Sequence, residues 1–291
     1  MKTILVATDF SKASNAASVY GLKLARAFNA RLILFNCYQH VPVPAGEVPM
    51  FVESEAVKKL ILNRLQNTSE IINYGQAVDI KTCCEEGPAA ETILRAATNK
   101  KADIIIVGMK RTGRSFRRIF GSTVTALART TTIPLIVVPQ NTKYSDPEAI
   151  VLANETDIEA DTDKHVFDAL IGIIKKFHSR LYMVRVAKNK YHEAFEMLNH
   201  PVSLNKMVSP LGPQYEYLYG TNTPQVLNEF ISKHNVNMLA LLPHKHSLFE
   251  RLFIKSITRS MTFATHIPLL IMPDVQKVET KQTRYNEEIL A

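Results

Sequence analysis

Glycine, hydroxyl and basic residues gather between residues 108 and 123 in a pattern that suits phosphate binding. Gly108 ends an apolar segment, and Gly121-Ser122-Thr123 opens a segment with helical periodicity. Glycine lets the backbone approach a ligand closely, and the unpaired N–H groups at a helix N-terminus favour an anion. The stretch between these glycines contains a run of cations: Lys110, Arg111, Arg114, Arg117 and Arg118. The pattern predicts a phosphate site, and the alternative is a solvated basic loop.

Two further apolar segments are followed by residues that we expect to lie beside this loop. Residues 4–7 are followed by Thr8 and Asp9, and residues 31–36 are followed by Cys37. In an open parallel sheet, ligands bind beyond the carboxyl ends of the strands, where the winding reverses. We therefore expect Thr8, Asp9, Cys37 and Val107 to line one site together with the glycines and hydroxyls of residues 108–123.

Short apolar segments alternate with amphipathic helical patterns through the first half of the chain. Continuous apolar runs suit strands buried on both faces, and apolar residues at three- and four-residue spacing indicate helices. The expected strands are residues 4–7, 31–36, 78–84, 102–108 and 133–139, and the expected helices are 14–28, 53–72, 88–97 and 122–129. This order predicts an α/β fold built on a five-stranded, parallel, doubly wound, Rossmann-like sheet.

The second half repeats the first. Ile150-Val-Leu-Ala153 matches Ile4-Leu-Val-Ala7, and Ile267 to Pro273 shares with Ile133 to Pro139 the pattern Ile-Pro-Leu-x-x-x-Pro. Such matched ends favour a tandem duplication. We expect two domains, residues 1–141 and 147–274, joined by a linker and followed by a polar tail at residues 275–291.

These residues resemble the universal stress protein family in its tandem two-domain form. Nucleotide-binding members carry a glycine, two residues, a glycine, nine residues, then glycine and Ser or Thr after strand four. Gly108, Gly121 and Ser122 fall on that spacing, whereas Arg111 stands at the second glycine. The resemblance implies an adenine nucleotide alpha hydrolase-like fold that holds ATP or another adenine nucleotide. It also implies that Asp9 faces the adenine and that a strand-two residue near Cys37 lines the pocket.

The resemblance has two implications for the second half. Closing strands of the family pair across a twofold, which would place residues 135–138 beside residues 269–272 and make one chain an internal pseudo-dimer. The nucleotide motif is lost there, because Pro243 and Ser256 replace the two glycines and Ile257 replaces the hydroxyl residue. We therefore expect one nucleotide site per chain.

Arg111 leaves two alternatives open for the first site. Its side chain could fill the space of the ribose or phosphates, or its guanidinium could contact phosphate oxygens. Because the surrounding loop is basic, we expect phosphate contact.

The amino-acid composition bears on the number of domains and on the compartment in which the protein works. The chain has 291 residues, of which 46% are hydrophobic and 21% charged, as in an ordinary globular protein of about two domains. Its three cysteines, two of them adjacent, argue against a disulfide framework and favour a reducing compartment. No apolar run approaches the roughly 20 residues of a membrane helix, so we expect a cytoplasmic protein without a membrane partner. Three histidines at positions 244, 246 and 266 have spacing too irregular to predict a metal site.

Three classes of function compete. The first is a non-catalytic adenine-nucleotide-binding protein of stress response or regulation. The second is an interaction protein that has lost nucleotide binding and presents its basic loop to an acidic protein partner, which the net charge of +8 would favour. The third is a hydrolase or transferase of a phosphorylated small molecule, for which Asp9 is the only candidate base and no activated nucleophile is evident. Nucleic acid is not expected as a partner, because no recognition motif is present.

Overall fold

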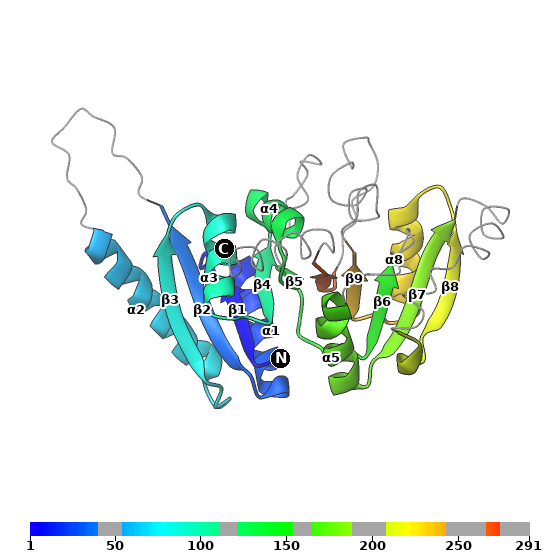
Figure 1. Cartoon of the computed structure of the whole chain (residues 1–291), viewed down its shortest axis with the longest axis horizontal. Helices are drawn as coiled ribbons and strands as arrows, with labels where there is room; N and C mark the ends of the chain where they lie inside the picture. Colours follow the sequence, from blue (N-terminus) through cyan, green and yellow to red (C-terminus); the bar gives the residue numbers. More distant parts are fainter. Residues whose placement is uncertain (40–53, 111–120, 154–163, 188–207, 243–265, 274–291) are drawn as a thin grey trace, which may run out of the picture.

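A computed structural model describes residues 1–39, 54–110, 121–153, 164–187, 208–242 and 266–273 (Figure 1). Within these residues the strands form one sheet of ten strands, in the order β3-β2-β1-β4-β5-β10-β9-β6-β7-β8. Each half of the chain supplies five neighbouring strands, and the two sets meet at β5 and β10. The prediction of two tandem α/β domains with doubly wound sheets is confirmed.

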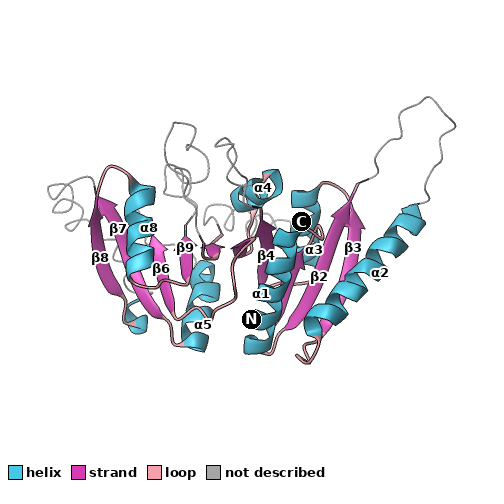
Figure 2. Cartoon of the chain, turned by 180° about the vertical axis from the view of Figure 1, so that it is seen from behind, coloured by secondary structure: helices cyan, strands magenta, loops and turns pink. Residues whose placement is uncertain are grey.

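The first half contains five parallel strands and four helices among its described residues. The strands are β1 (Thr3–Ala7), β2 (Arg31–Tyr38), β3 (Ile80–Glu86), β4 (Ile104–Met109) and β5 (Leu135–Pro139). The helices are α1 (Lys12–Phe28), α2 (Ser54–Asn73), α3 (Ala89–Asn99) and α4 (Ser122–Thr130). Side chains of α1 and α2 share one apolar core, and those of α3 and α4 share the other, so helices cover both faces of the sheet (Figure 2).

The element boundaries differ slightly from those expected from the sequence. The third strand begins at Ile80 rather than at residue 78. Asn73, at the end of α2, explains the difference, because its side chain binds both the N–H and the carbonyl of Val78 at 3.0 and 2.9 Å. These hydrogen bonds hold Val78 in the turn and keep it out of the sheet.

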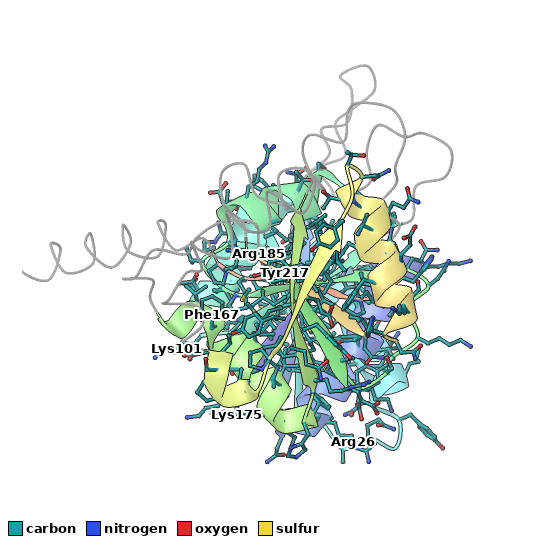
Figure 3. All side chains as sticks on the ribbon, turned by 90° about the vertical axis from the view of Figure 1, so that its right-hand side faces the viewer. Arg26, Lys101, Phe167, Lys175, Arg185 and Tyr217 are labelled. Carbon is teal, nitrogen blue, oxygen red and sulfur yellow. The ribbon has the colours of Figure 1, made fainter. Side chains whose placement is uncertain are left out.

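The second half follows the same order of strands, and all pairs within it are parallel. Its strands are β6 (Ala149–Ala153), β7 (Arg180–Ala187), β8 (Gln214–Tyr219), β9 (Met238–Leu241) and β10 (Leu269–Ile271). Its described helices are η1 (Lys164–Phe167), α5 (Asp168–Phe177), η2 (Ser209–Leu211) and α8 (Thr223–Lys233). Figure 3 looks onto the β8 side, where Arg185 of β7 and Tyr217 of β8 are register partners and Phe167 is fully buried.

The two halves meet through the sheet and through the helices beside it. β10 runs antiparallel to β5, with Leu269 opposite Val137 and Ile271 opposite Leu135. The expected pairing of the closing strands is therefore present. On one face of the sheet, the rings of Phe28 from α1 and Phe177 from α5 lie edge to face with centroids 6.1 Å apart.

The segment that joins the halves packs against the first of them. The ring of Tyr144 lies 5.1 Å from that of Tyr20 on α1, and its hydroxyl donates to Asp146 at 2.9 Å. Thr142 donates to the carbonyl of His266, close to β10, at 3.1 Å. The connection is thus part of the packed interface. The polar tail expected at residues 275–291 lies outside the described residues.

Candidate functional site

The carboxyl ends of β2, β1 and β4 lie side by side at one edge of the first half. Ala7, at the end of β1, is in register with Phe35 of β2 and Val107 of β4. This register brings together five residues that the sequence predicts as site residues: Thr8, Asp9, Cys37, Val107 and Gly108. Figure 1 shows α4 at the same end of the sheet as the arrowheads of β2 and β3.

A buried polar network fixes the turn between β1 and α1. The Thr8 hydroxyl donates to the Ser14 hydroxyl and accepts from the Phe10 N–H, both at 3.0 Å, while the Asn36 amide donates to the Thr8 carbonyl at 2.7 Å. Ser11 caps α1 by accepting from the Ser14 N–H. Thr8 is 4% exposed, and its hydroxyl is already used as donor and acceptor. It positions the turn and has little capacity left for a ligand.

Asp9 projects from this turn into solvent as an ionised carboxylate. One oxygen accepts the Ser11 N–H at 3.0 Å, and the other lies 3.2 Å from the Lys110 ammonium. Partial burial acts to raise the pKa of Asp9, but hydrogen bonds from Ser11, Ser14 and Lys110 outweigh it and lower the pKa to about 2. A group with so low a pKa is a weak general base near neutral pH, although it is a strong hydrogen-bond acceptor.

Gly108 has a packing role that does not depend on a ligand. A Cβ atom at this position would lie 2.3 Å from the backbone carbon and oxygen of Ala13 and 2.5 Å from the Ser14 nitrogen. The first turn of α1 therefore rests directly on β4, and no side chain fits between them. The glycine at this motif position brings the start of α1 and the end of β4 together.

Gly121 differs from Gly108, although both belong to the same motif. It caps α4 in an extended conformation that any residue adopts, and a Cβ there would meet nothing within 4 Å. Ser122 is exposed and Thr123 half-buried. Gly121 has no side chain that could cap α4, and the N-terminus of this nine-residue helix places a positive dipole end at the carboxyl edge.

Cys37 lies beside Asp9 but is not an activated nucleophile. Burial raises the pKa of its thiol, and the Asp9 charge raises it further, so the neutral thiol dominates near pH 7. All three cysteines lie within the described residues, and all three are free. No chemistry in the described residues requires them.

Lys110 belongs to the basic run in the sequence, and the structure pairs it with Asp9, which lies 101 positions earlier. The signal for this pairing in the sequence was the place of Lys110 two residues after Gly108, at a strand end. Several expected features lie outside the described residues: Arg111, Arg114, Arg117 and Arg118 of the loop, and Pro243, His244, His246, Ser256 and Ile257 of the second half.

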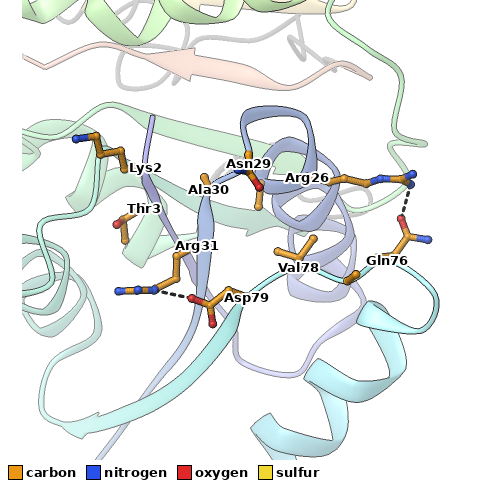
Figure 4. A pocket seen from close by; sticks show the side chains of 11 residues that line it. Lys2, Thr3, Arg26, Asn29, Ala30, Arg31, Gln76, Val78 and Asp79 are labelled. Atoms are coloured by element: carbon orange, nitrogen blue, oxygen red, sulfur yellow. Dashed lines mark hydrogen bonds and ion pairs between the residues drawn. The ribbon is translucent and has the colours of Figure 1, made fainter.

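A hollow lies at the opposite, amino edge of the same strands (Figure 4). This cavity of about 410 Å³ is lined by the starts of β1 and β2, by the end of α1 and by residues 76–79, which precede β3. Arg31 bonds Asp79 at 2.8 Å, and Arg26 bonds Gln76 at 2.9 Å. These groups satisfy one another, and they lie at the end of the sheet where doubly wound folds do not bind ligands.

Within the described residues, no group of three or more His, Cys, Asp or Glu side chains is arranged to hold a metal ion. No helix in this part of the chain is long and apolar enough to cross a membrane.

Comparisons with known proteins agree with the geometry. The model of the universal stress protein family matches residues 1–139. A universal stress protein of Thermus aquaticus is 30% identical over 137 residues, which are 47% of this chain and 98% of the relative. One from Synechocystis is 27% identical over 139 residues, which are 47% of this chain and 85% of the relative.

A solved structure resembles almost the whole chain. The universal stress protein of Archaeoglobus fulgidus matches with a TM-score of 0.64 and 10% identity, covering 92% of this chain and 97% of that one. Each sequence relative thus corresponds to about half of this chain, whereas the structural match extends over both halves and shows a shared fold.

Proposed function

Because this chain belongs to the universal stress protein family, we propose that its first half binds an adenine nucleotide and that the protein acts without catalysis in stress response or regulation. One observation carries the proposal. The ionised Asp9 carboxylate and the N-terminus of α4 lie at the same edge of the sheet. A carboxylate suits the amino group of a base, and the donors of a helix N-terminus suit phosphates.

The same residues argue against catalysis. The low pKa of Asp9 makes it a poor general base, and the raised pKa of Cys37 keeps its thiol neutral. Asp9 and Cys37 therefore do not supply the activated group that a hydrolase or transferase would need. We propose that the second half serves as a fixed partner, held through β5 and β10, and carries no equivalent nucleotide site.

Isothermal titration calorimetry with ATP, ADP and adenosine tests the proposal. We expect one nucleotide per chain and a loss of affinity of about tenfold in Asp9→Asn, because a charge-assisted hydrogen bond becomes a neutral one. Asp79→Asn is a matched control, since Asp79 is an exposed aspartate in an ion pair at the opposite edge of the sheet.

Three outcomes would count against the proposal. Two equivalent sites would refute the assignment to the first half, and equal losses in Asp9→Asn and Asp79→Asn would remove Asp9 from the site. Absence of nucleotide binding, both in calorimetry and in mass spectrometry of ligand released from purified protein, would favour the interaction protein with an acidic partner.

A further inference from the structure

An ion pair between Lys110 and Asp9 lies at the carboxyl edge of the first half. The Lys110 ammonium lies 3.2 Å from one oxygen of Asp9, and the Ser11 N–H lies 3.0 Å from the other. Each carboxylate oxygen therefore has one contact within the protein. A ligand donor that approaches the oxygen beside Lys110 competes with the ammonium for it.

The backbone holds the two partners in register. Lys110 directly follows β4 and Asp9 lies two residues beyond Ala7 of β1, and these neighbouring strands pair in parallel. Gly108 brings β4 against the first turn of α1, so the lysine starts close to the turn that carries Asp9. The contact thus connects the ends of two strands that form the floor of the proposed site.

The ion pair between Asp9 and Lys110 can break easily, because both side chains are exposed to solvent. The side chains of both Asp9 and Lys110 are 61% exposed. Solvent-exposed ion pairs are weak, because water screens the charges and both side chains lose freedom. A ligand phosphate can therefore compete for the ammonium, which as a flexible point charge binds phosphate well.

Resting on the proposed function, we propose that Lys110 is an exchangeable counter-ion that makes the site prefer phosphorylated adenine ligands over the nucleoside. In the empty site it neutralises Asp9. When a nucleotide binds, the ammonium turns to the phosphate oxygens, and the released Asp9 oxygen accepts the amino group of the base. Asp9 and Lys110 then each have a hydrogen-bond partner in both states. A nucleoside, in contrast, displaces Lys110 from Asp9 and offers it no anion.

Calorimetry with ATP and with adenosine on Lys110→Met and Lys110→Arg tests the inference. In Lys110→Met we expect ATP affinity to fall by about tenfold, since one charge-assisted contact is lost, while adenosine affinity rises by about threefold, since its competitor is gone. Lys110→Arg keeps the charge, so it should restore ATP affinity to within about threefold of the original protein. Lys23→Met is the matched control, because Lys23 lies on α1 and bonds Gln76 beside the opposite edge of the sheet.

The possible outcomes distinguish a failure of the counter-ion role of Lys110 from a failure of nucleotide binding itself. Parallel losses for ATP and adenosine in Lys110→Met, or no change for either, would overturn the counter-ion role while nucleotide binding stands. If the original protein binds neither ligand, the proposed function is wrong and the inference is wrong with it. Unchanged thermal unfolding of the variants confirms that affinity, and not folding, is compared.

Discussion

The two halves of the chain share a strand order but connect their first strand and first helix differently. In the first half, β1 ends at Ala7 and α1 begins at Lys12, so a short, hydrogen-bonded turn holds Asp9 at the strand end. In the second half, β6 ends at Ala153 and the corresponding α5 begins only at Asp168, after η1. The helix is also shorter, with 10 residues where α1 has 17.

This difference shows which parts of the duplicated fold tolerate change. The sheet needs only apolar residues in register, and the strands β4 and β9 are almost entirely buried in their respective halves. The carboxyl edge of the first half also depends on where α1 begins, because the short turn before this helix carries its cap, Ser11, and places Asp9 beside Lys110. The connection between strand and helix can therefore change while the sheet is preserved.

The seam between β5 and β10 should show the largest effect, because it ties the halves together. Leu270 is fully buried opposite Ile136, so Leu270→Ala should lower the free energy of unfolding by about 2 to 5 kcal/mol through lost burial and a cavity. Leu60→Ala, on the outer face of α2 where the side chain is 70% exposed, should change it by less than about 0.5 kcal/mol. Urea denaturation measures both, and similar values would mean that the seam contributes little.

Substitutions of the two motif glycines should differ next in their effect on stability. Gly108→Ala places a Cβ 2.3 Å from the α1 backbone and should cost about 1 to 3 kcal/mol of stability, since a helix or strand must shift. Gly121→Ala meets no neighbour within 4 Å and should stay within about 0.5 kcal/mol. Thermal unfolding of the pair distinguishes them. Equal destabilisation would contradict the packing role assigned to Gly108.

The ionisation of Asp9 should make the stability of the fold depend on pH in the acid range. Its folded pKa, about 2, lies below the ordinary value of 3.8, so the ionised form stabilises the fold above about pH 4. This contribution should vanish as the pH falls through about 2. Because Asp9 is largely exposed, solvent screening reduces the expected advantage over Asp9→Asn to about 1 kcal/mol or less. Urea midpoints of both proteins between pH 2 and 6 should converge at the acid end; a constant difference would refute the linkage.

Phenylalanine substitutions at the two tyrosines of the interface should differ by a similarly small amount. The Tyr20 hydroxyl is buried and has no hydrogen-bond partner among the described residues, whereas Tyr144 donates to Asp146. Tyr20→Phe should therefore leave stability unchanged or raise it slightly, while Tyr144→Phe should lose about 0.5 to 1.5 kcal/mol. Calorimetric unfolding provides the comparison. A larger loss in Tyr20→Phe would reveal a partner for its hydroxyl.

Sequence reasoning located the strands well, because each is a continuous apolar run between polar turns. The pattern Ile-Pro-Leu-x-x-x-Pro at both closing strands also revealed the duplication, and with the family resemblance it indicated the pairing that the structure contains. The start of β3 was wrong by two residues, since the bonds from Asn73 to Val78 follow from a turn geometry that propensity does not encode. The assignment of the candidate site residues to a nucleotide stays a prediction.

The apolar pattern by itself determined the succession of strands and helices along the chain, the tandem repeat and the position of a polar edge, because strands buried on both faces and short connections leave few other arrangements. Only the tertiary structure decided that Lys110 meets Asp9 and that Gly108 is required by the backbone of α1. Both contacts join residues about a hundred positions apart. They depend on strand register and on how closely a helix rests on its sheet, distances that no local pattern of residue types records.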